Sequence, residues 1–103
     1  MYTPDSFVIL KILTDEPFYK VLAGWSGGYL DGDYWRINSG IESYTESDGM
    51  VDFIGASGSV YRCSVESERL TMAMSDVYNQ LVDKGLAERV TYEEFKNDNN
   101  SNA

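Results

Sequence analysis

The sequence predicts an α+β fold: a twisted antiparallel β-meander of about six or seven short strands, with a carboxyl-terminal helix packed on one face. Turns rich in Gly, Asp and Ser separate short apolar or alternating runs, and one later segment has a helical apolar stripe. A chain of 103 residues, 43% of them hydrophobic, suits one domain. We expect this domain to span residues 1–96 and the polar segment 97–103 to be a disordered tail. The pattern leaves open whether the sheet closes into a barrel.

The first two expected strands form a hairpin. Phe7–Leu13 is apolar on both alternations, which is typical of a central strand covered on both faces. A turn leads from it into Phe18–Trp25, whose alternating pattern predicts the second strand. A glycine-rich loop follows, and residues 34–38 make the third strand. We expect both tryptophans, Trp25 and Trp35, to point inward.

The clearest hairpin signal is Asp48-Gly49, which lies between the expected strands 41–47 and 50–55. A two-residue loop would pair Tyr44 with Phe53 and would place charged and apolar groups on one face. A three-residue loop at 47–49 would pair Tyr44 with Asp52 instead, so that polar residues face polar residues. We therefore favour the three-residue loop.

The segment after the expected strand 60–65 has two interpretations. Arg69–Met74 alternates strictly, which favours a strand over the opening of a helix. Ser75 then caps a helix over 75–84, which ends at Lys84-Gly85. This helix should cover the sheet with an apolar stripe: Val77, Leu81 and Val82.

The end of the chain carries a second helix signal. Residues 86–90 are expected to be irregular or a short strand. Thr91 and Glu94 have the spacing of a capping box, which predicts a last helical turn that carries Phe95.

Charge and composition restrict the function. Eight Lys and Arg against seventeen Asp and Glu give a net charge of −9, which repels phosphate backbones and anionic lipid headgroups. Without histidine, the chain lacks the commonest general base and zinc ligand. We therefore expect no enzyme, no metal or other cofactor, no direct nucleic-acid binding and no membrane association. The single cysteine and the absence of a basic leader favour a cytoplasmic protein.

Two motifs could carry chemistry, but each is better explained structurally. Cys63 lies on the expected inner face beside Tyr61 and Val65, so we interpret it as a core residue. Asp31-Gly32-Asp33 lacks the later ligands that a calcium loop needs, so we interpret it as an acidic turn.

The most informative feature is an excess of acid in the middle of the chain. Between residues 31 and 52 there are six acidic residues and one basic residue, Arg36. The favoured register gathers an acidic, tyrosine-bearing outer face, which we expect to bind a basic protein surface. Its residues are Tyr34, Glu42, Tyr44, Glu46 and Asp52.

The leading hypothesis is thus a small acidic, non-enzymatic protein-binding module. A more specific version is an inhibitor that occupies the nucleic-acid-binding surface of its partner by imitating negative charge, as phage- and plasmid-encoded antidefence proteins do. The alternative is a carbohydrate- or small-ligand-binding module, because aromatic rings and carboxylates lie close together in the loop at 25–36. Its candidate residues are Tyr29, Asp31, Asp33 and Tyr34.

Overall fold

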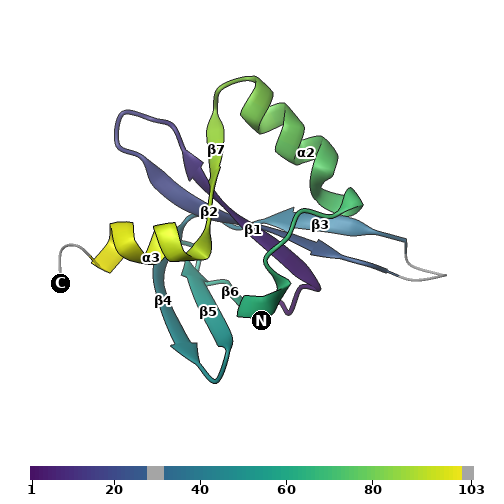
Figure 1. Cartoon of the computed structure of the whole chain (residues 1–103), viewed down its shortest axis with the longest axis vertical. Coiled ribbons are helices and arrows are strands. Elements are labelled where there is room, and N and C mark those ends of the chain that lie inside the picture. The colour runs from purple at the N-terminus through teal and green to yellow at the C-terminus, as the bar shows by residue number, and fades with distance from the viewer. Residues whose placement is uncertain (28–31, 101–103) are drawn as a thin grey trace.

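A computed structural model describes residues 1–27 and 32–100, which form an α+β fold of two antiparallel sheets and two α-helices (Figure 1). The strands are β1 (Ser6–Ile12), β2 (Phe18–Trp25), β3 (Tyr34–Ile37), β4 (Ile41–Ser47), β5 (Met50–Gly55), β6 (Val60–Ser64) and β7 (Ala87–Val90). The helices are a 3-10 turn η1 (Val65–Ser67), α2 (Met72–Asp83) and α3 (Tyr92–Asn100). The predicted fold class is confirmed, and the sheets do not close into a barrel.

The strands divide into a four-stranded sheet in the order β3-β2-β1-β7 and a three-stranded sheet in the order β4-β5-β6. β1 lies inside the larger sheet and is buried on both faces, as its uninterrupted apolar run predicts. The predicted β1–β2 hairpin is confirmed, with Phe7 opposite Ala23 and Ile12 opposite Phe18. The chain is nevertheless not one continuous meander, because it crosses to the second sheet between Ile37 and Ile41.

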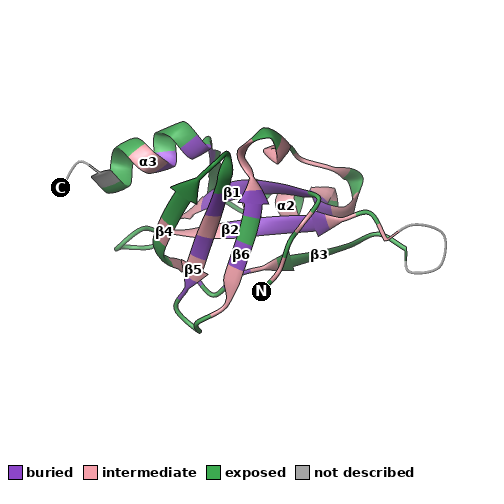
Figure 2. Ribbon diagram, turned by 90° about the horizontal axis from the view of Figure 1, so that it is seen from below, coloured by how far each residue is buried: buried purple, intermediate pink, exposed green. Residues whose placement is uncertain are grey.

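The three layers are α2, the four-stranded sheet and the three-stranded sheet (Figure 2). Because neighbouring strand residues point to opposite faces, β1 supplies both cores. The first core lies under α2 and contains Val8, Leu10, Leu22, Met74 and Ala87. The second lies between the sheets and is closed at one end by α3: Phe7, Ile9, Val21, Ala23, Val51, Phe53, Tyr61, Cys63, Val90, Tyr92 and Phe95.

The helix α2 begins earlier than the sequence suggested. The prediction of a strand at 69–74 is wrong: the chain makes one isolated bridge between Glu68 and Phe7 and then enters the helix at Met72. Thr71 is the N-cap, and Ser75 instead donates its hydroxyl to the Thr71 carbonyl. The predicted end is confirmed, since Gly85 has a φ of 70° and its N–H donates to the Val82 carbonyl.

The helix α3 carries the predicted capping box. Thr91 N–H donates to Glu94 Oε1 at 2.9 Å, and Glu94 N–H donates to Thr91 Oγ1 at 3.0 Å. The helix is longer than the single turn expected, because it continues through residues 97–100, part of the segment for which the sequence predicts a disordered tail. Residues 101–103 lie outside the described part of the chain.

The favoured register of the β4–β5 hairpin is wrong. Asp48 and Gly49 have φ angles of 54° and 78° and form a two-residue turn, which pairs Tyr44 with Phe53. Glu46 therefore lies opposite Val51, an arrangement that places a charged residue across from an apolar one. It is tolerated because the Glu46 carboxylate reaches the edge of the core and accepts a hydrogen bond from the Tyr92 hydroxyl at 2.5 Å.

Candidate functional site

The candidate site is the outer edge of β3 together with a groove at its end. β3 pairs with β2 on one side, and within the described part of the chain no strand pairs with its other side. Asn38 N–H donates to the Val21 carbonyl at 3.1 Å, just beyond the strand. Along an antiparallel strand, successive residues direct their N–H and C=O groups to alternate sides, so Tyr34 and Arg36 direct these groups toward β2. Trp35 and Ile37 therefore direct their N–H and C=O groups toward the open edge.

The end of β3 is fixed by a side chain. The Asn38 carboxamide oxygen accepts a hydrogen bond from Val21 N–H at 2.8 Å, in the place of the next backbone partner. Asn38 is buried, and its Nδ2 has no hydrogen-bond partner among the described residues. Because the buried Val21 N–H needs an acceptor, the Asn38 carboxamide keeps its Oδ1 turned toward β2. The strand is thereby held against β2 up to the point where the chain leaves for the second sheet.

The exposed side chains of β3 are mainly aromatic. Tyr34 is 46% exposed, and its ring stacks on Trp25 with centroids 5.0 Å apart. Trp35 is 44% exposed and lies on the α2 side, opposite Gly24. The expectation that Trp35 points into the core is therefore wrong, because it is on an edge strand and only part of its ring is covered. Trp25 is half-buried and packs against the core as expected.

Arg36 lies on the same face of β3 as Tyr34. Its guanidinium stands over the Tyr2 ring, 4.8 Å from the ring centroid. Tyr2 in turn packs against Trp25 and Tyr61. This side of β3 is thus supported by a cluster of packed aromatic rings, which hold the edge strand in place.

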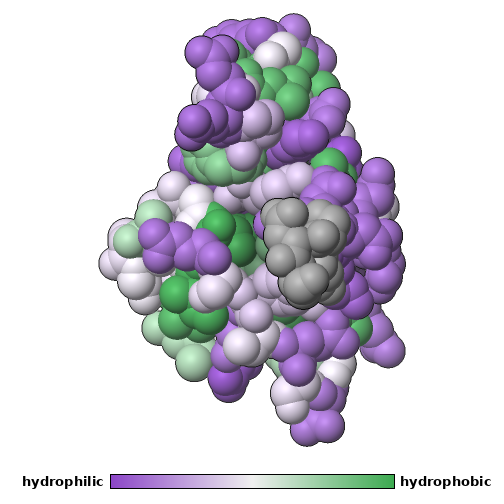
Figure 3. All heavy atoms as spheres, turned by 90° about the vertical axis from the view of Figure 1, so that its left-hand side faces the viewer, coloured by the Kyte–Doolittle hydropathy of each residue, from purple (hydrophilic) through white to green (hydrophobic). Residues whose placement is uncertain are grey.

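An apolar groove of about 290 Å³ lies beyond the carboxyl end of β3. The hairpin β1–β2, the end of α2 and Ile37 of β3 form its walls. The side chains that line it are Ile12, Leu13, Thr14, Phe18, Lys20, Ile37, Leu81 and Leu86. From another side, a space-filling view of the molecule shows hydrophobic residues in separate patches among hydrophilic ones (Figure 3).

The acidic face predicted from the sequence is not assembled. Tyr34 lies on the four-stranded sheet, whereas the other four predicted residues lie on the three-stranded sheet. Tyr44 packs its ring on Phe95 with centroids 5.1 Å apart.

Glu46 binds Tyr92 and lies 3.5 Å from Lys96. The Tyr92 hydrogen bond lowers the pKa of Glu46, and burial raises the pKa of Tyr92. Glu42 is exposed on β4.

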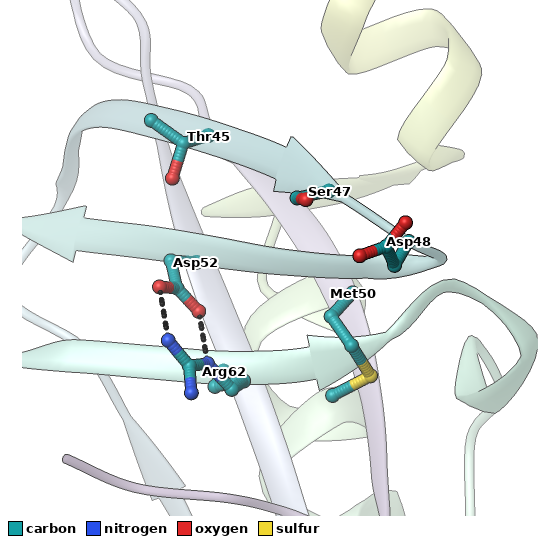
Figure 4. A pocket seen from close by; sticks show the side chains of 6 residues that line it. All are labelled: Thr45, Ser47, Asp48, Met50, Asp52 and Arg62. Carbon is teal, nitrogen blue, oxygen red and sulfur yellow. Dashed lines mark hydrogen bonds and ion pairs between the residues drawn. The ribbon is translucent and has the colours of Figure 1, made fainter.

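Asp52 lies on the opposite face of the three-stranded sheet. Arg62 on β6 donates two hydrogen bonds to its carboxylate, at 2.8 and 2.9 Å (Figure 4). These bonds lower the pKa of Asp52. The hollow around the pair, about 280 Å³, is otherwise lined by Thr45, Ser47, Asp48 and Met50. The charges of Asp52 and Arg62 are therefore engaged with one another.

The alternative ligand site is only partly described. Tyr29 and Asp31 lie outside the described residues, and Asp33 is exposed directly before β3. One face of the Tyr34 ring is occupied by Trp25. Across residues 1–27 and 32–100, no group of three His, Cys, Asp or Glu side chains could hold a metal ion. Cys63 is buried, and burial raises the pKa of its thiol to about 12.

Sequence reasoning found Tyr34 but missed the edge and the groove. The groove joins residues as distant in sequence as Ile12 and Leu86, so only the fold brings them together. The exposure of Trp35 follows from the place of β3 at the edge of the sheet, which the pattern of a four-residue strand does not reveal.

Comparisons with known proteins give no further guide to the site: no family model, no curated protein and no solved structure matches this chain. None of the helices described is long and apolar enough to span a bilayer.

Proposed function

We propose that this protein is a binding module that takes an extended segment of a basic partner protein onto the open edge of β3. In this mode of recognition the added strand gains main-chain hydrogen bonds from the edge, and side-chain contacts supply specificity. The backbone groups of Trp35 and Ile37 would form those bonds. Exposed aromatic rings at 34 and 35 would anchor the segment, as aromatic residues commonly do at interfaces.

One comparison within the molecule carries the proposal: the edges of its two sheets are not equally protected. Proteins commonly protect edge strands with charged side chains or with another segment of the chain. The residues exposed on β7 are Glu88 and Arg89, and those on β4 are polar or charged. The edge of β6 is covered, because Tyr2 bonds to Val60 and Arg62. On β3, by contrast, two of the three exposed residues are aromatic.

The charge of the chain supports a basic partner. A net charge of −9 creates a field that accelerates the approach of a positive protein and opposes the approach of a second copy of this chain. Proteins whose basic surface binds nucleic acid belong to the class of partner favoured here. Binding to such a surface would compete with the nucleic acid, which is the inhibitory role that the charge suggests.

The test is affinity capture from source-cell extract with two variants of one residue. In Trp35→Pro the N–H that faces the open edge is lost and the β2 ladder is kept, since proline is tolerated where the N–H points away from the sheet. Trp35→Ala removes the same ring and retains the N–H. We expect the captured basic protein to bind wild type, to bind Trp35→Ala more weakly and to be lost with Trp35→Pro. Its association rate should fall as salt rises.

A second measurement locates the contact. Amide hydrogen exchange at Trp35 and Ile37 should slow when the captured partner is bound. A partner that binds Trp35→Pro and Trp35→Ala equally well, or that leaves exchange at these amides unchanged, would refute strand addition at β3. Circular dichroism of both variants checks that the sheets are retained.

A further inference from the structure

The groove at the end of β3 has the character of a side-chain pocket. Three of its lining residues are large hydrophobics that solvent reaches, with Leu13 43%, Phe18 38% and Leu86 51% exposed. Among the described residues that line the groove, Lys20 alone is charged, and its ammonium lies 5.9 Å from the centroid of the Phe18 ring. The groove therefore suits an uncharged, apolar group.

The groove is small and only partly enclosed, which favours a side chain held by another chain over a free small molecule. Pockets for small ligands typically enclose about 300–1,000 Å³ and bury most of the ligand. This groove, at about 290 Å³, lies at the lower end of that range and is only partly enclosed. Such a site can accommodate one bulky aliphatic or aromatic side chain whose own backbone lies outside the groove.

The position of Ile37 connects the groove with the open edge. Ile37 is both the last residue of β3 and a lining residue of the groove. In a β-ladder, residues directly opposite one another have their side chains on the same face of the sheet. A partner residue that pairs with Ile37 would therefore direct its side chain to the α2 face, where the groove begins.

The same rule assigns the neighbouring positions of the partner. A residue opposite Trp35 lies on the same face as the indole, two positions from the residue opposite Ile37. The residue between them lies beside Arg36 on the other face, where a basic side chain would be repelled. Acidic residues follow the lining residues closely in the sequence: Asp15 and Glu16 come directly after Thr14 in the β1–β2 turn, and Asp83 ends α2 two positions after Leu81.

We propose that the partner's recognition element is an extended apolar–x–apolar segment with a non-basic central residue and basic flanks, whose apolar residue opposite Ile37 enters the groove. The inference rests on the proposed strand addition at β3 and specifies the class of segment bound there. Strand addition supplies the backbone contacts, and the groove selects the side chain.

The experiment uses the wild-type protein as bait and selects the peptides that bind it from a displayed library of random linear peptides. Binding of the selected peptides is then compared on three variants: Leu86→Gln in the groove, Trp35→Pro at the edge, and Met72→Gln as the control. Met72 is 86% exposed and belongs to neither surface. Since Leu86 is also exposed, its replacement should leave the fold intact.

We expect the selected peptides to share the apolar–x–apolar pattern in a basic context. Leu86→Gln should reduce the affinity for these peptides on the order of tenfold, because apolar contact is lost. Trp35→Pro should abolish binding, and Met72→Gln should have no effect. Replacing the apolar peptide residue opposite Ile37 by alanine should weaken binding to wild type similarly, and should weaken binding to Leu86→Gln little further.

Failure of the two proposals would give different results. Peptides that lose affinity for Trp35→Pro but bind Leu86→Gln like wild type would refute the groove and leave strand addition standing. Peptides that bind Trp35→Pro like wild type would refute strand addition itself. A selection that yields no binding peptide would contradict both.

Discussion

The packing of α2 on β2 depends on the absence of a side chain at Gly24, and this can be tested by adding one methyl group. A Cβ at residue 24 would lie 2.5 Å from Met74 Sδ, 2.8 Å from Met74 Cγ and 3.1 Å from Ser6 Oγ. Met74 is fully buried, and its sulfur accepts hydrogen bonds from the hydroxyls of Ser6 and Thr71. The thioether therefore cannot move without losing contacts. We expect Gly24→Ala to destabilise the protein by about 1–3 kcal/mol, the usual cost of overpacking a core.

A double-mutant cycle isolates the cause. Met74→Ala alone should cost about 2–5 kcal/mol, because it removes a buried side chain and leaves a cavity. In that background the added methyl group meets no thioether and only Ser6 Oγ at 3.1 Å remains close, so Gly24→Ala should lose most of its cost. The free energies of unfolding can be measured by urea denaturation, with the fluorescence of the two tryptophans, Trp25 and Trp35, as the probe. In thermal melts, Gly24→Ala alone should lower Tm by about 4 °C or more.

The control is Gly58→Ala, where the new Cβ meets no atom within 4 Å but φ is 89°. Its cost is conformational, so it should be the same with and without Met74. Two results would refute the reasoning: a cost below about 0.5 kcal/mol for Gly24→Ala in the wild type, or an equal cost in both backgrounds.

Two further predictions concern a thiol and a carboxylate. Cys63 is buried and its thiol pKa is raised to about 12, so an alkylating reagent should label it only after denaturation, and fast labelling of the native protein would show that the site is open. The pKa of Glu46 is lowered in the folded state, so its contribution to stability is present above its unfolded pKa and is lost as pH falls through the folded pKa. Tyr92→Phe removes the principal donor and should flatten the acid limb of a stability–pH curve, whereas an unchanged acid limb would show that the bond is unimportant.

The local features of the fold were predictable because neighbouring residues determine them. The β1–β2 hairpin, the end of α2 at Gly85 and the capping box of α3 each depend on a few adjacent residues. The start of α2 was not predictable in this way. Leu70, Met72 and Met74 alternate as in a strand, whereas Leu70, Met74 and Val77 also have helical spacing. Packing decides between them, since Met74 is buried and Met72 is exposed.

The register of the β4–β5 hairpin shows a second limit. Matching polar with polar residues across the strands assumed that the face bearing Tyr44 and Glu46 meets water. In the structure α3 covers this face, so Tyr44 packs on Phe95 and Glu46 binds Tyr92. Those partners lie more than forty residues further along the chain. The two-residue turn at Asp48-Gly49, the stronger local signal, was the better guide.

The charge of the chain and the open edge of β3 have a common physical consequence. An exposed edge strand is a template on which another copy of the same chain can pair, and aromatic residues such as Tyr34 and Trp35 strengthen that tendency. A net charge of −9 opposes it, because two copies repel one another as they approach. The same field attracts a positive protein. The charge of the whole molecule would thus keep the edge free of self-association and, under the function proposed above, available to a basic partner.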